Sequence, residues 1–211
     1  MAIAGASPVM GQTIVDRWAE VAIPAPPVLV PVTVKPARSA LLVLDMLAVN
    51  CVPEKRPSCV RSIAPVEALL KRARAAGMLV IYSAGQAGSV VPPDPVAPLK
   101  PLAGEPMVRA GADKFLHSDL EQILKQHGID TVIITGTSAE GAVLYTASGA
   151  SGRGFQVVVP VDGLSAAQNF AELYTVWHLQ HAPASITSRI QVTSSDQIAI
   201  EQARPDKGRM P

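Results

Sequence analysis

The stretch that decides the fold runs from Thr131 to Ala147 and reads TVIITGTSAEGAVLYTA. It begins with an apolar run of strand length that ends at Gly136, which is typical of a parallel strand covered on both faces. A turn of small residues follows, in which Thr137 and Ser138 can cap the next helix. A helix N-terminus presents unpaired N–H groups to an anion or an oxyanion, so we expect the functional site at this turn.

Further apolar runs alternate with helical periodicity on both sides of this stretch, which predicts an α/β fold with a parallel sheet. The expected strands are 39–45, 78–83, 107–110, 131–136, 156–161 and 190–193, and the expected helices are 63–76, 118–127, 139–151 and 166–180. The chain length suits one domain, which we place at residues 37–200. A polar, flexible tail is expected at 201–211.

Residues 1–36 form a Pro-rich arm in which residues 14–23 could make a short amphipathic helix. Two interpretations of the arm stay open. It is either a disordered leader or an extended segment packed on the core or on a neighbouring subunit. The Val-Pro alternation from Val28 to Val34 and the presence of Trp18 favour packing.

Composition excludes several classes of function. The chain has 18 basic and 17 acidic residues, so it lacks the electrostatic footprint of a nucleic-acid or membrane-surface protein, and small-molecule or protein partners are expected. Its apolar runs are too short to span a bilayer and no signal peptide is visible, so we expect a cytoplasmic protein. Cys51 and Cys59 fit reduced thiols better than a disulfide, although a bridge between them stays open.

Motifs for common cofactors are absent from the sequence. Neither a dinucleotide fingerprint nor a phosphate-binding loop occurs, and no nucleophile elbow of the α/β-hydrolase type is present. The four histidines lie at positions 117, 127, 178 and 181, without partners at the spacing of a zinc site. We therefore expect no cofactor and no metal.

Two charged residues are candidates for catalysis. Asp45 follows the apolar run 39–44, and the ligand crevice of an open parallel sheet lies outside the carboxyl ends of its strands. The alternative is a capping or turn aspartate. Lys114, in the context Gly-Ala-Asp-Lys-Phe-Leu, is either a solvated surface charge or a side chain that points inward.

The chain contains, in order, the apolar run that ends at Asp45, the Asp-Lys-Phe element around Lys114, and two segments that follow it. This order resembles that of the isochorismatase-like cysteine hydrolase superfamily. The resemblance spans residues 39–193 and is most specific in the segment IITGTSAEGAVLYTA at 133–147 and in the segment RGFQVVVPVDG at 153–163. It implies a Rossmann-like three-layer α/β/α fold with a six-stranded, mostly parallel sheet, and assembly into a homo-oligomer, either a dimer or larger. It also implies a cis peptide bond between Thr137 and Ser138.

The resemblance assigns roles by position. Asp45 matches the catalytic aspartate, Lys114 the catalytic lysine, and Ala142 the place of the nucleophilic cysteine. The oxyanion turn would comprise Thr137, Ser138 and Gly141, and the substrate pocket Leu47, Tyr82 and Phe115. The zinc-binding nicotinamidase branch is excluded because no histidine lies between Asp45 and Lys114.

Three functions follow as alternatives, because a methyl group at Ala142 cannot attack a carbonyl. The first is acid-catalysed hydrolysis of a vinyl ether, in which Asp45 delivers a proton and Lys114 holds a substrate carboxylate. Leu47 departs from that scheme, since relatives carry glutamine there. The second is a non-catalytic binding or assembly protein. The third is an amide hydrolase whose cysteine was replaced by engineering. Cys51 is a poor substitute nucleophile because its loop offers no helix N-terminus.

Overall fold

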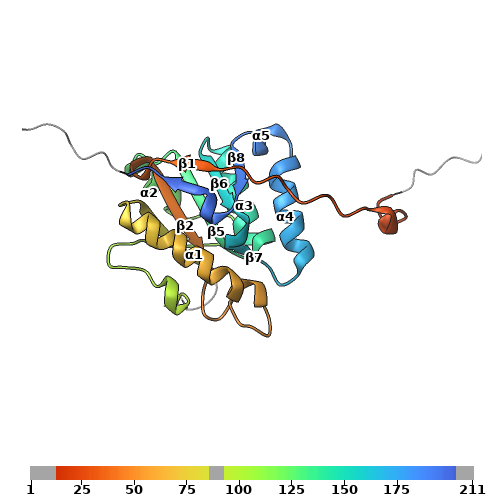
Figure 1. Ribbon diagram of the computed structural model, residues 1–211, viewed down its shortest axis with the longest axis horizontal. Coiled ribbons are helices and arrows are strands. Elements are labelled where there is room, and N and C mark those ends of the chain that lie inside the picture. The colour runs from red at the N-terminus through yellow and green to blue at the C-terminus, as the bar shows by residue number, and fades with distance from the viewer. Residues whose placement is uncertain (1–12, 86–92, 203–211) are drawn as a thin grey trace, which may run out of the picture.

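The computed structural model describes residues 13–85 and 93–202, and a parallel sheet lies at its centre (Figure 1). The strands are β1 (Val32–Val34), β2 (Ser39–Leu44), β3 (Leu79–Gly85), β4 (Met107–Ala110), β5 (Thr131–Thr137), β6 (Gln156–Pro160), β7 (Leu164–Ser165), β8 (Ile190–Thr193) and β9 (Ile198–Ile200). Six of them form the path β4-β3-β2-β5-β6-β8, with every neighbouring pair parallel. This confirms the expected fold class. The two-residue strand β7 adds a seventh member by pairing with the end of β5.

Both faces of the sheet are covered by apolar side chains, and this explains why β2 is buried along its whole length. Alternate residues of each strand point to opposite faces, so Leu42 joins one core cluster and Leu41 joins the other. The helices are α1 (Pro57–Ala75), α2 (Leu120–Gln126), α3 (Leu144–Gly152), α4 (Asn169–His181) and α5 (Ala184–Thr187). The first cluster packs against α2, α3 and α4, and the second against α1 and the β1–β9 pair.

Several helix boundaries differ from those expected. Helix α1 begins at Pro57 instead of residue 63, because its first turns carry small and polar residues that hide the apolar period, and proline is accepted at the first helical position. The expected helix 139–151 starts as a π-helical turn, Ala139–Val143, before α3. Helices α2 and α4 each begin two or three residues later than predicted.

The arm divides into two parts. Residues 13–27 are largely exposed, and the expected helix at 14–23 is reduced to a 3-10 turn, Trp18–Glu20. From Val32 the chain pairs with β9, so the last part of the arm belongs to the folded domain. Figure 1 shows the first described residues, in red, reaching outward beyond α4. Residues 1–12 and most of the expected tail lie outside the described residues.

Cys51 and Cys59 form a disulfide, which corrects the expectation of reduced thiols. The turn after Cys51, closed by hydrogen bonds from the Lys55 and Arg56 N–H groups to the Val52 carbonyl, leads directly into the first turn of α1. This reversal brings the two Cα atoms to 5.1 Å, within the usual range for a disulfide. The early start of α1 therefore explains why the sequence spacing was misleading.

Across the described ranges, no helix is both long enough and apolar enough to cross a bilayer.

Candidate active site

The candidate site lies where the direction of the strand order changes. From β2 the chain continues to β3 and β4 on one side, and from β5 it continues to β6 and β8 on the other. Ligand crevices of open α/β sheets form at such a switch point, outside the carboxyl ends of the two central strands. Leu44 of β2 pairs with Gly136 of β5, so Asp45 and Thr137 both follow at this edge.

Gly136 permits this close approach of β5 to β2. Its backbone φ angle is +142°, which residues with a side chain rarely adopt, and a Cβ atom there would lie only 2.2 Å from the Leu44 carbonyl oxygen. Any larger residue would displace one of the two strands that carry the site.

Asp45 is held by hydrogen bonds on both its backbone and its side chain. Its Oδ1 atom accepts a hydrogen bond from Ser83 Oγ at 2.7 Å, and its Oδ2 atom accepts one from Lys114 Nζ at 2.7 Å. Asn50 Nδ2 donates to the Asp45 carbonyl at 2.9 Å, and the φ angle of Asp45 is +52°, a left-handed conformation that aspartate tolerates. The Asp45 side chain is 17% exposed, so a ligand can reach it.

Lys114 points inward, and the solvated alternative does not apply. Its side chain is 1% exposed, and its ammonium group contacts Asp45 and, at 3.4 Å, the Ala110 carbonyl. Its backbone N–H donates to Thr146 Oγ1 on α3 at 3.1 Å. A buried charge is unfavourable unless it is paired, so the position of Lys114 depends on the Asp45 carboxylate.

The turn after β5 is closed by its own backbone. The Thr137–Ser138 peptide bond is cis. The Gly141 and Val143 N–H groups both donate to the Ser138 carbonyl at 3.2 Å. Ser138 stands at the N-cap position, but its side chain makes no capping hydrogen bond, so the expected hydroxyl cap is wrong. Thr137 is also not a cap, because its hydroxyl donates to the Ser165 carbonyl at 3.2 Å.

Ala142 lies within this π-helical turn and is 4% exposed. The chain contains two cysteines, and both belong to the Cys51–Cys59 disulfide, so it has no free thiol. Cys51 is therefore excluded as a substitute nucleophile on chemical grounds. In the described part of the chain, no group of three or more histidine, cysteine or acidic side chains gathers as a metal site would require.

The three pocket candidates have different surroundings. Leu47 is buried beside the site, with its N–H bonded to the Asp45 carbonyl at 2.7 Å. Phe115 belongs to the core and stacks on Phe155, with ring centroids 5.8 Å apart. Tyr82 packs in the cluster under α1, where burial raises its pKa to about 12 and its hydroxyl accepts a hydrogen bond from Arg74. The contacts of Tyr82 and Phe115 are those of structural residues, which differs from the pocket role expected.

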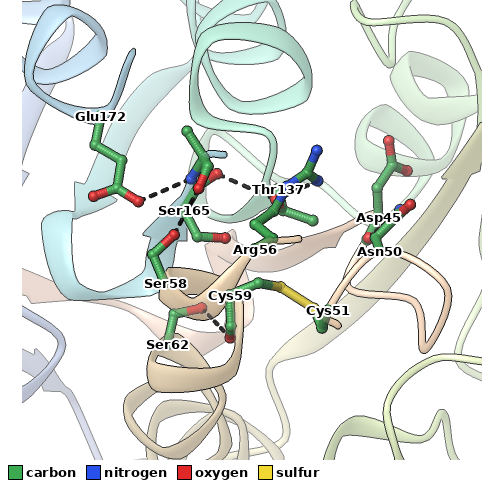
Figure 2. Close-up of a disulfide and its surroundings, with 11 residues drawn as sticks. Asp45, Asn50, Cys51, Arg56, Ser58, Cys59, Ser62, Thr137, Ser165 and Glu172 are labelled. Carbon is green, nitrogen blue, oxygen red and sulfur yellow. Dashed lines mark hydrogen bonds between the residues drawn. A yellow bond between two sulfur atoms is a disulfide. The ribbon is translucent and has the colours of Figure 1, made fainter. Parts of the chain in front are cut away.

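Sequence reasoning missed four residues that position the site: Asn50, Arg56, Ser83 and Thr146. Ser83 could have been found, because it directly follows the apolar run 78–82 of a strand that neighbours β2, in register with Leu44. The other three act through loops and a helix whose relative placement the sequence does not reveal. Figure 2 shows Arg56 with Thr137, to whose hydroxyl it donates a hydrogen bond at 2.9 Å.

Comparison with known sequences gives two matches. The model of the isochorismatase domain matches residues 39–191. Streptothricin hydrolase from Streptomyces noursei is 34% identical over 132 residues, which cover 58% of this chain and 52% of that protein. The chain thus spans about half the length of this curated relative.

Solved structures show the same fold. An isochorismatase family protein from Desulfovibrio vulgaris superposes with a TM-score of 0.68 at 20% identity, covering 75% of this chain and 95% of that one. A cysteine hydrolase from Pseudomonas syringae gives 0.69 at 22% identity, covering 81% and 95%. N-carbamoylsarcosine amidase from Thermoplasma acidophilum gives 0.63 at 21% identity, covering 75% and 97%. Because the family model covers the central sheet and both residues of the Asp45–Lys114 pair, the chain belongs to the isochorismatase family.

Proposed function

We propose that this protein is a hydrolase of small molecules that works without a cysteine nucleophile. The observation that carries the proposal is the Asp45–Lys114 ion pair at the switch point of a chain that has no free thiol. A buried ion pair is a poor device for stability alone, so its presence at the ligand edge favours a chemical role.

The pair can transfer one proton. Lys114 is enclosed, whereas Asp45 is partly exposed, so a proton that leaves the pair passes from the ammonium to the carboxylate and then to the substrate. In vinyl-ether hydrolysis that proton would bond to the enol carbon, and the ether oxygen would stabilise the resulting oxocarbenium ion. Water would then add to the cation and return a proton to the pair. The hemiketal would finally break its C–O bond to give a carbonyl product and an alcohol.

In this scheme Lys114 serves as the proton reservoir. Its ammonium is already bonded to Asp45 and is almost fully buried, which speaks against the expected role of holding a substrate carboxylate. In the turn of Thr137, Ser138 and Gly141, the Ser138 hydroxyl, which makes no capping hydrogen bond, would bind a substrate oxygen, and Leu47 would provide an apolar wall beside Asp45.

A second candidate is an amide hydrolase whose nucleophile was replaced at Ala142. The intact ion pair favours it, and the similarity to streptothricin hydrolase supports a hydrolase of some kind. In that case the turn keeps the backbone arrangement that would surround a cysteine at position 142, and a cysteine introduced at Ala142 would restore acyl transfer.

The test is a panel of vinyl ethers, amides and ureido acids assayed with the native chain, with Asp45→Asn and with Ala142→Cys. We expect the native chain to hydrolyse at least one vinyl ether, and Asp45→Asn to lower kcat by about 100-fold or more, the usual contribution of a general acid. Amide hydrolysis that appears only in Ala142→Cys would favour the second candidate. No turnover by any of the three proteins would leave the non-catalytic alternative.

We also propose that the protein forms a homo-oligomer. Large apolar side chains are exposed on the arm, including Trp18 and Ile23, and on α4, including Phe170 and Trp177. Contiguous exposed apolar surface of this kind favours association with another protein surface. The cytoplasmic location stays an expectation from the sequence, and the Cys51–Cys59 disulfide is unusual for that compartment.

A further inference from the structure

Arg56 is a cation that has no role in the proposed reaction, although it lies beside the turn after β5 at the ligand edge of the sheet. It occupies the N-cap position of α1, is half-buried, and donates from Nη1 to Thr137 Oγ1 at 2.9 Å. Figure 2 shows its guanidinium group beside Thr137. Thr137 is the residue after Gly136, just as Asp45 is the residue after its strand partner Leu44. Arg56 thus contacts Thr137, which follows β5 at the same edge of the sheet where Asp45 follows β2.

The charge of Arg56 has no acidic partner within residues 13–85 and 93–202. Arg74 and Arg38 differ in this respect, since Arg74 pairs with Glu105 at 2.7 Å and Arg38 pairs with Asp130 at 2.6 Å. Arg72 also lacks an acidic partner among the described residues, but its guanidinium is occupied by the Ile198 and Ser195 carbonyls, whereas that of Arg56 is not. A guanidinium carries five N–H donors, and the neutral hydroxyl of Thr137 occupies one. The edge formed by Nε and Nη2 is therefore free to bind a planar oxyanion with two hydrogen bonds.

The chain holds Arg56 in place through short-range contacts. The Arg56 N–H donates to the Val52 carbonyl at 2.7 Å, and the Cys59 N–H donates to the Arg56 carbonyl at 3.0 Å. The Cys51–Cys59 disulfide spans this turn, and the Cys51 N–H donates to the Leu47 carbonyl at 3.0 Å. Because the loop is tied at both ends, binding a ligand at Arg56 requires little ordering of the backbone.

A second polar group near Thr137, the Ser165 hydroxyl, also has unused hydrogen-bonding capacity. Ser165 pairs with Thr137 in the β5–β7 register and is fully buried, yet its Oγ atom makes no hydrogen bond among the described residues. Buried hydroxyl groups are usually satisfied, so this one is suited to a polar ligand or to water.

From these contacts we propose that Arg56 binds the carboxylate of the substrate, so that the site selects small carboxylic acids. The inference rests on the proposed function for the location of the reaction, with Asp45 and Lys114 at the scissile bond. It differs from the sequence expectation, in which Lys114 held that carboxylate. Lys114 supplies the proton, and Arg56 supplies the fixed positive charge.

Ligand binding tests this inference without requiring turnover. The probes are benzoate and nitrobenzene, which share a planar shape but differ in charge, titrated into the folded protein and followed by 1H–15N NMR. The variants are Arg56→Gln and Arg56→Lys. Arg61→Gln is the matched control, because it removes the same charge from an exposed position of α1.

We expect Arg56→Gln to raise the Kd of benzoate about tenfold or more, as for loss of a charge-assisted hydrogen bond, and to leave the Kd of nitrobenzene within about twofold. Arg56→Lys should lie between, since it keeps the charge and loses the two-pronged geometry. An unchanged benzoate Kd in Arg56→Gln, or an equal increase in Arg61→Gln, would overturn the inference.

The two proposals fail separately. Turnover that depends on Asp45, combined with benzoate binding that ignores Arg56, would overturn only the role of Arg56. Benzoate binding that depends on Arg56 in a chain without turnover would overturn only the hydrolase. Where a carboxylate substrate is turned over, Arg56→Gln should raise KM much more than it lowers kcat.

Discussion

Removing either partner of the Asp45–Lys114 pair should destabilise the fold, but to different extents. Asp45→Asn removes the negative charge beside the Lys114 ammonium, which is 1% exposed, and leaves it only neutral acceptors, the new amide oxygen and the Ala110 carbonyl at 3.4 Å. We expect a loss of about 4 kcal/mol in the free energy of unfolding, within the range for a buried charge left unpaired. Lys114→Met keeps the apolar stem and leaves Asp45, 17% exposed, bonded to Ser83. Water can reach that carboxylate, so we expect a loss of about 2 kcal/mol.

Urea denaturation followed by circular dichroism measures both losses, and urea avoids the screening of charges that a salt denaturant causes. The double variant Asp45→Asn/Lys114→Met should lose less than the sum of the single losses, because it leaves no unpaired charge. The exposed Lys71–Glu67 pair provides the control, and removing it by Lys71→Met should cost under about 1 kcal/mol. The reasoning is refuted if Lys114→Met loses more free energy of unfolding than Asp45→Asn. It is also refuted if the loss in the double variant equals the sum of the losses in the two single variants.

Three further predictions concern the turn, the core and the arm. Ala142→Cys would carry the only thiol outside the disulfide. The helix N-terminus should make this thiol react with iodoacetamide faster than the exposed thiol of the control variant Tyr145→Cys. Equal or slower alkylation of Ala142→Cys would contradict an activating site. Burial raises the pKa of Tyr82 from 10.0 to about 12, so its contribution to stability should be present below pH 10 and lost as the pH rises through 12. Absorbance at 295 nm should show a late phenolate step that Tyr82→Phe removes, and its persistence in that variant would refute the assignment. Light scattering should give an oligomeric mass that falls when residues 1–27 are deleted, and a monomeric mass for the intact chain would contradict the proposed assembly.

Alternation of buried apolar runs with helical periodicity was sufficient to predict the α/β class and most strands. Strand β2 is recognisable because both of its faces are buried, so nearly every residue is apolar, and β5 is recognisable from its apolar run 132–134. The start of α1 was not recognisable. Its first turns hold Ser58, Cys59 and Ser62, which are buried by contacts from distant segments, as the bond from Ser58 Oγ to the Ala166 carbonyl illustrates.

The candidate site was predictable in part. Asp45 could be named because a carboxylate that ends a buried strand is unusual and lies at the ligand edge. The inward direction of Lys114 stayed open, because a lysine in a loop has the same local sequence whether it is solvated or paired. Contacts with Asp45, Ala110 and Thr146, from three separate elements, determine its burial.

The sequence by itself determined the sheet, the absence of a nucleophile at Ala142 and the number of cysteines. Tertiary structure alone decided that those cysteines are paired, that Ser83 and Lys114 share the Asp45 carboxylate, and that Arg56 lies against Thr137. The physical reason is the separation along the chain over which each kind of interaction acts. Periodicity and turn chemistry act over a few neighbouring residues, whereas the contact of Arg56 with Thr137 joins positions 81 residues apart and exists only once β2, β5 and α1 have packed.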